Sequence, residues 1–170
     1  MAAASFTDTV LQRIDAKGRV SIPAAFRRVL DAGDPDREAG ELPSVMLCYG
    51  PHLKGHFRGY TVAAHEEAGR LINAIEPTSP EVARRKQMAQ KLHFGCAFRL
   101  EIEREGRVVM PAARRAALGV EEGELAFRGM GDFFEVWNAG AFAEADADLE
   151  SFLEAEEGFD PTALPFMVGR

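Results

Sequence analysis

Apolar and polar residues alternate in several short stretches of this chain, whereas its middle has apolar residues at helical spacing. Alternation favours strands, because successive side chains point to opposite faces, and a spacing of three or four residues favours helices. The pattern predicts strands at 9–14, 20–22, 44–49, 96–103, 124–128 and 132–137, and helices at 24–30, 61–75, 81–92 and 141–156. Pro23 is predicted to be the first residue of its helix. The chain is therefore predicted to be mainly β with added α-helices.

One stretch occurs twice: segment 13–30, RIDAKGRVSIPAAFRRVL, is closely repeated at 102–118, IEREGRVVMPAARRAAL. A constant offset, position 103 against position 15, aligns the two without a gap, and nine of seventeen aligned positions are identical. The identical positions are Ile14, Gly18, Arg19, Val20, Pro23, Ala24, Ala25, Arg27 and Leu30, each with its counterpart. A unit of strand, turn, strand and helix is too small to bury its own apolar face. The duplication therefore predicts two halves that pair around one shared core.

The turn at the start of each copy has residues suited to a tight connection between strands. Gly18 and its counterpart Gly106 tolerate a positive φ, which such turns often require. Asp15 is predicted to accept hydrogen bonds from the amides of the turn or to pair with Arg19, and Glu103 has the same place in the second copy. A lone basic turn is most simply interpreted as a solvated hairpin, but its repetition favours a binding role.

The formal net charge of −7 is unevenly distributed, which matters for the kind of partner that the chain can bind. Residues 121–170 have 13 acidic and two basic side chains, a net charge of −11, which leaves +4 for the first 120 residues. Segment 13–30 alone has five basic side chains and one acidic side chain. Because local fields matter more than the overall sign, the negative net charge does not exclude nucleic acid.

Three motifs together resemble the MraZ family of bacterial regulators, which is found with genes of cell division and the cell wall. They are DAKGR with SIPAAFR at 15–27, EREGR with VMPAARR at 103–115, and GMGDFFEVWNAGAF at 129–142. The resemblance implies a double-split, swapped-hairpin β-barrel built from the internal duplication, similar to the wider AbrB/MazE class. It also implies a homo-oligomeric ring that binds double-stranded DNA at direct repeats in the promoter of its own gene cluster.

The resemblance also assigns the DNA contact to particular residues. The family's D-x-x-x-R motif corresponds to Asp15 and Arg19, with Lys17 between them, and in the second copy to Glu103 and Arg107. Lysine and arginine bind phosphates, and the planar arginine side chain also matches O6 and N7 of guanine. We therefore predict that Arg19 and Lys17 make most of the DNA contact.

The second turn departs from this pattern. Glu105 stands where the first turn has its lysine, and glutamate replaces aspartate at the start of the motif. Two acids around Arg107 make it the weaker candidate for DNA binding, whereas Arg13, just before the first turn, is expected to support the contact. The arginines on the two helices are expected to be solvated or to face another subunit: Arg27, Arg28, Arg114 and Arg115.

The pattern also predicts how the chain is divided. We expect a flexible lead-in at 1–8, a first AbrB-like half at 9–57, a helical connector at 58–95, a second AbrB-like half at 97–140, an acidic helix at 141–157 and a flexible tail at 158–170. The N-terminus has no signal-peptide pattern, and Cys48 and Cys96 fit buried thiols in a reducing compartment. These features favour a cytoplasmic protein that does not interact with membranes, and the resemblance to MraZ implies that it associates with the nucleoid.

Other functions have less support in the residues. His52 and His56 are four apart, but Pro51 and Gly55 disfavour the helix that a shared metal would need, so no metal or cofactor is expected. The chain has no nucleophile–base arrangement, G-x-S-x-G motif or phosphate-binding glycine loop, so no enzyme and no small-molecule substrate are expected. The alternative is an antitoxin-like interaction module whose acidic C-terminal segment binds a partner without operator binding.

Overall fold

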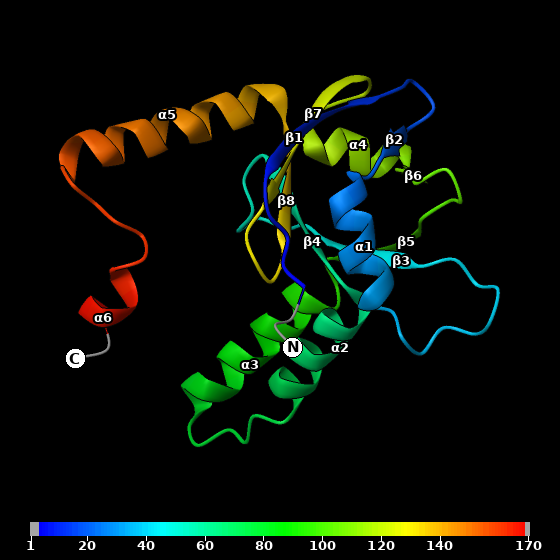
Figure 1. Ribbon diagram of the computed structural model, residues 1–170. Helices are drawn as coiled ribbons and strands as arrows, with labels where there is room; N and C mark the ends of the chain where they lie inside the picture. The colour runs from blue at the N-terminus through cyan, green and yellow to red at the C-terminus, as the bar shows by residue number, and fades with distance from the viewer. Residues whose placement is uncertain (1–3, 169–170) are drawn as a thin grey trace.

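The computed structural model describes residues 4–168 (Figure 1). Its strands are β1 (Thr9–Ile14), β2 (Arg19–Ser21), β3 (Ser44–Cys48), β4 (His56–Tyr60), β5 (Ala97–Glu101), β6 (Arg107–Val109), β7 (Gly123–Gly129) and β8 (Phe134–Asn138). Its helices are α1 (Ala24–Ala32), α2 (Val62–Asn73), α3 (Pro80–His93), α4 (Ala112–Leu118), α5 (Ala139–Ala155) and α6 (Leu164–Val168). The fold is mainly β with added helices, which confirms the predicted class.

The eight strands join one antiparallel sheet in the order β5-β3-β4-β8-β7-β1-β2-β6. Four pairings join a strand of the first half to a strand of the second: β1 with β7, β2 with β6, β3 with β5, and β4 with β8. The end strands β5 and β6 follow each other in the chain, and in the turn between them the Glu103 amide donates to the Arg107 carbonyl at 2.8 Å. The sheet therefore nearly closes into a barrel made of two interleaved halves, which confirms the predicted double-split architecture.

The pairing of β2 with β6 is centred on a local two-fold axis. Val20 pairs with Val108, its own counterpart in the duplication, and both side chains are 1% exposed. Near the same axis the Ile22 amide donates to the Gly106 carbonyl at 2.9 Å, and the equivalent bond in the other half measures 2.8 Å. Each half thus braces the turn of the other, which explains why one core needs two copies of the unit.

Aromatic side chains from both halves fill the interior. Phe134 of β8 has ring-centroid distances of 4.9 Å to Phe6 and 5.0 Å to Phe26. Gly59 of β4 leaves the space for this ring, because a Cβ there would lie 2.2 Å from it. Phe6 is 2% exposed, and its amide donates to the Gly131 carbonyl at 2.8 Å. Within the predicted flexible lead-in at 1–8, Phe6 therefore belongs to the core, and positions 1–3 lie outside the described residues.

Some elements differ from those predicted. The strand β4 was not expected, because its sequence HFRGY follows a loop rich in proline and glycine, and Gly59 replaces an apolar side chain on its inward face. Pro23 is the N-cap of α1 rather than its first residue, and its extended ψ of 137° lets the chain leave β2 before the helix begins. The segment predicted as a flexible tail contains the short helix α6, and positions 169 and 170 lie outside the described residues.

The helices α2 and α3 project together from one end of the barrel (Figure 1). Thr61 and Ser79 cap them by accepting hydrogen bonds from amides of their first turns, at 3.0 Å and 3.2 Å. The rings of His65 and His93 stack with 4.0 Å between centroids, and each Nε2 lies within 3.1 Å of the other residue's carbonyl oxygen. Burial lowers the pKa of His65, which favours the neutral ring in this stack.

The helix α5 leaves the barrel in a different direction (Figure 1). Asn138 caps it by accepting from the Ala141 amide at 2.8 Å, and the Arg128 guanidinium joins its first turns to the barrel. That guanidinium pairs with Asp146 and lies 4.5 Å from the centre of the Phe142 ring. No helix in the described part of the chain combines the length and the apolar character needed to cross a bilayer.

Candidate nucleic-acid interface

The first turn is organised by the carboxylate of Asp15. Its Oδ1 accepts hydrogen bonds from the amides of Lys17 at 2.9 Å and Arg19 at 3.0 Å, and its Oδ2 accepts from Arg19 Nε at 2.7 Å. The bond from the Arg19 amide, followed by that from the Arg19 side chain, lowers the pKa of Asp15 below its usual range. Gly18 completes the turn with a φ of +86°. Arg19 is therefore held by its Nε, while Lys17 is exposed to solvent.

The second turn has the same backbone but fewer side-chain contacts. Gly106 also has a φ of +86°, and its amide donates to the Glu103 carbonyl at 2.8 Å. The Glu103 carboxylate lies 3.6 Å from Arg107 Nε, as an ion pair rather than a short hydrogen bond. Among residues 4–168 no amide donates to this carboxylate, since the additional methylene of glutamate changes its reach. The second turn is therefore held by backbone hydrogen bonds, without the side-chain hydrogen bonds that Asp15 makes in the first turn.

An arginine from the opposite half packs against the first turn. Arg115 of α4 lies beside Gly18, and its Nη1 donates to the carbonyls of Ala16 at 2.9 Å and Glu121 at 3.0 Å. The prediction that Arg115 is solvated or faces another subunit is therefore wrong, because the swapped pairing brings α4 onto a turn 99 residues away. The sequence contained one signal for this contact, because the same arginine occurs in both copies of the repeat.

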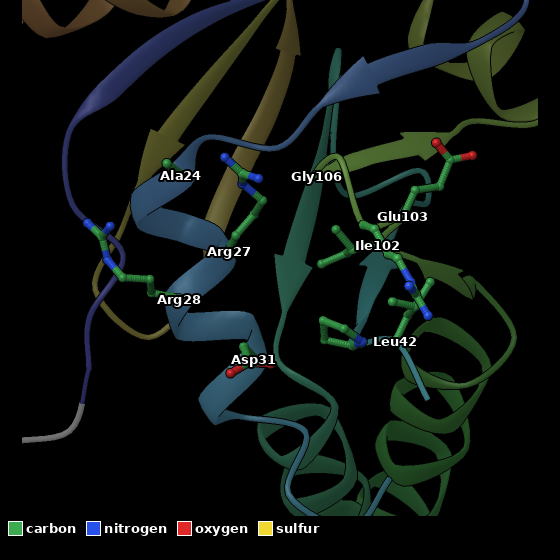
Figure 2. Close-up of a pocket in the computed structure, with 10 residues that line it drawn as sticks. Ala24, Arg27, Arg28, Asp31, Leu42, Ile102, Glu103 and Gly106 are labelled. Carbon is green, nitrogen blue, oxygen red and sulfur yellow. The ribbon is translucent and has the colours of Figure 1, made fainter. Parts of the chain in front are cut away.

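Arg27 of α1 has the equivalent place at the second turn. Figure 2 shows its guanidinium pointing toward the loop at Gly106, where an added Cβ would lie 2.1 Å from Arg27 Nη1. A cavity of about 490 Å³ opens beside it, between α1 and the second turn. Arg28 points away from that loop. Arg27 is therefore also a turn-supporting residue that the sequence analysis missed.

The two arginines of the D-x-x-x-R positions lie on one outward face of the β2–β6 ribbon. Arg19 is opposite Val109, and Ser21 is opposite Arg107, while the central valine pair points into the core. Directly opposed residues of an antiparallel pair point to the same face, and diagonal neighbours lie roughly 7–8 Å apart. Both arginine side chains are 41% exposed. The structure thus brings Arg19 and Arg107 together around the local two-fold axis.

Arg13 lies outside this ribbon, on β1. It is exposed, and the strand register places it opposite Glu124 of β7. Side chains so opposed share one face of the sheet, so an acidic group lies next to Arg13. Arg13 therefore lies on a strand beside an acidic residue, whereas Lys17 projects from the first turn itself.

Histidines and cysteines of the described residues form no second site. The ring of His56 stacks on Trp137 with 4.1 Å between centroids, and no group of three or more His, Cys, Asp or Glu within residues 4–168 is placed to hold a metal ion. Cys48 and Cys96 are free thiols, and burial raises the pKa of Cys48 to about 11. Cys96 is only half-buried, less than its apolar neighbours predict.

The fold and the two turns define this protein as an internally duplicated, swapped-hairpin barrel with a pair of outward arginines at its local two-fold axis. No family model matches the chain. It is 38% identical over 151 residues to a protein of Ruegeria pomeroyi named transcriptional regulator MraZ, a match covering 88% of this chain and 87% of the relative.

Two further relatives have the same name. A protein of another Ruegeria species is 33% identical over 159 residues, covering 92% of this chain and 91% of the relative. A protein of Gluconobacter oxydans is 32% identical over 143 residues, covering 82% and 79%. At this identity over most of its length, the chain belongs to the MraZ family.

Proposed function

We propose that this chain is a sequence-specific DNA-binding transcriptional regulator, not an enzyme, and that its first turn makes the main contact with double-stranded DNA. The observation that supports this most directly is the way Asp15 holds Arg19. With its Nε bonded to the carboxylate at 2.7 Å, the guanidinium has its two terminal nitrogens left for a ligand, on the outward face of the ribbon. A fixed planar fork of this kind suits bidentate contact with guanine in the major groove.

The remaining candidate residues have unequal parts in this proposal. Lys17 is exposed beside Arg19 and supplies a phosphate contact, and Arg13 on the adjoining strand adds a further positive charge. Arg107 lies on the same face, but Glu103 and Glu105 surround it with negative charge that repels phosphate. The second turn therefore contributes mainly to the fold, and Arg107 contributes to DNA binding less than Arg19 does.

The chain is further proposed to act as a ring of identical subunits in the cytoplasm, bound to the nucleoid. The resemblance to MraZ proteins supports direct repeats in the promoter of a division and cell-wall gene cluster, including the chain's own gene, as the target. One basic turn is a weak site, but several turns on one face of a ring contact several repeats at once. Avidity then increases without any new contact in each subunit.

The test is a mobility-shift titration with DNA from upstream of the chain's own gene. The intact repeats are compared with a fragment of equal length in which the repeats are scrambled, over a series of salt concentrations. We expect tighter binding to the intact repeats, with a logarithmic salt slope of about −0.9 for each phosphate contacted. Equal binding to both fragments, or no binding to either at low salt, contradicts the proposal.

A further inference from the structure

The C-terminal arm, residues 147–168, extends beyond the barrel and has an apolar side that is left exposed by the other residues of segment 4–168. Leu149, Phe152 and Leu153 of α5 are 48%, 42% and 47% exposed and lie three and four residues apart, so they share one face of the helix. Phe159 folds back onto Phe152 with 5.0 Å between ring centroids, yet it is still 38% exposed. An apolar face of this kind is typical of a protein contact.

The charges of the arm restrict what that contact can be. Residues 147–168 contain six acidic side chains and no lysine or arginine. Asp148 and Glu150 lie on either side of Leu149 around the helix, so the apolar face has acidic borders. Two such arms repel each other, because like charges at close range are unfavourable. The arm therefore requires a partner surface that is both apolar and basic.

The outer face of α3 has this character. Lys86 points toward α2, where its Nζ donates to the carbonyls of Asn73 at 2.9 Å and Ile75 at 2.8 Å. Arg84, Met88 and Lys91 lie on the opposite side of α3, spaced four and three residues apart. Met88 is 38% exposed. Arg84 and Lys91 have no ion-pair partner among residues 4–168, and no residue of α3 is buried.

We propose that the arm of one subunit docks on the outer face of α3 of a second copy of this chain. Phe152 and its apolar neighbours cover Met88, and the bordering acids pair with Arg84 and Lys91. The two surfaces project from the barrel in different directions (Figure 1), so the contact joins different patches of two copies. A head-to-tail contact of this type closes into a ring when its rotation permits. The inference thus rests on the proposed ring and supplies the subunit contact that it lacks.

The test exchanges the charges of the two surfaces. The α3 variant is Arg84→Glu with Lys91→Glu, and the arm variant is Asp148→Lys with Glu150→Lys. Sedimentation velocity at one protein concentration and low salt should show that each variant alone falls from the wild-type mass toward that of a single chain. An equimolar mixture should recover the wild-type mass, because each basic surface then meets an acidic one. A chain with all four substitutions should recover it as well.

Two controls separate this result from misfolding and from a general charge effect. Recovery in the mixture shows that both variants are folded. A matched variant, Lys54→Glu with Arg70→Glu, makes the same change in charge at exposed positions away from the outer face of α3 and should keep the wild-type mass. An α3 variant with unchanged mass, or a mixture that fails to recover the wild-type mass, overturns the proposal. Loss of mass in the arm variant without loss of mass in the α3 variant overturns it too, since the arm then binds another surface or another protein.

The same set of proteins distinguishes this inference from the proposed function. Arg19→Ala changes no residue of the arm or of α3, so its mass should equal that of wild type. If Arg19→Ala loses DNA binding while the charge variants keep their mass, only the docking contact is wrong. If the charge variants lose their mass while Arg19→Ala binds the intact repeats like wild type, the docking contact stands and the DNA-binding assignment fails.

Discussion

The two turns of this barrel have nearly the same backbone, but only the first is held by an acidic side chain. Asp15 accepts two amide bonds and one guanidinium bond, whereas Glu103 contacts Arg107 at 3.6 Å and receives no amide bond among the described residues. Both turns have glycine at φ +86°, and both are packed by an arginine from the other half. The glycine and the packing arginine are thus common to both turns, whereas the aspartate contacts and the lysine that the proposed DNA contact uses occur only in the first.

Substitution of the two glycines tests how far the turns are equivalent in stability. An added Cβ at Gly18 would lie 2.3 Å from the Met110 carbonyl oxygen, which is backbone, whereas at Gly106 the nearest atoms belong to the Arg27 side chain, whose torsions can adjust. Gly18→Ala should lower the free energy of unfolding by about 3 kcal/mol and Gly106→Ala by about 1–2 kcal/mol. Urea unfolding at one protein concentration measures both, and a larger loss for Gly106→Ala contradicts the assigned contacts.

Reversal of the lysine charge tests whether the first turn contacts phosphate. Lys17→Glu gives the first turn the same residue that the second turn has at the equivalent position, and the exposed Lys17 side chain can be replaced without loss of the bond from its amide to Asp15. Affinity for the direct repeats should fall about tenfold, and the salt slope should decrease by about one. Titrations by fluorescence anisotropy at three salt concentrations provide both numbers. An unchanged salt slope places the phosphate contact elsewhere.

The reciprocal change tests whether the second turn can be made a better DNA binder. Glu105→Lys removes a negative charge beside Arg107 and supplies a lysine at the position equivalent to Lys17. We expect affinity to increase about threefold, with a steeper salt dependence. A distant Glu66→Lys change has the same charge effect and serves as the control. If both variants gain equally, net charge rather than the turn accounts for the increase.

A titration tests the role of the Asp15 carboxylate. Because bonds from Arg19 lower the pKa of Asp15, its stabilising effect is complete above the ordinary value of 3.8 and is lost as pH falls through the lower folded value. The difference in Tm between wild type and Asp15→Asn should therefore be constant from pH 5 to 7 and shrink below about pH 4. A difference that persists at low pH means that the charge of Asp15 does not hold the turn.

Much of the local structure follows from the sequence because it depends on neighbouring residues. The alternation at 9–14 predicts β1 with its observed bounds, and Gly18 and Asp15 predict the conformation of the first turn. The strand β4 could not be predicted in this way, since Gly59 is on its inward face to make room for Phe134, a residue of another strand. Its assignment depends on packing that the local pattern does not contain.

The candidate site shows the same limit. Arg19 and Lys17 could be proposed from a short motif that resembles that of the MraZ family, but Arg27 and Arg115 support turns in the opposite half of the molecule. Only the swapped register, in which Val20 pairs with Val108, brings those helices and turns together. The local sequence pattern does not predict such contacts, because the residues that make them are far apart in the chain. The presence of the same arginine in both copies nevertheless pointed to a shared structural role.

The central claim is that two similar arginines on one face have unequal roles, and a single comparison tests it most directly. Wild type, Arg19→Ala and Arg107→Ala are titrated against the same DNA with intact repeats and with one guanine of each repeat replaced. Arg19→Ala should lose about 1–3 kcal/mol of discrimination between the two DNAs, and Arg107→Ala should retain nearly all of it. Equal losses in the two variants, or a larger loss in Arg107→Ala, would contradict the account.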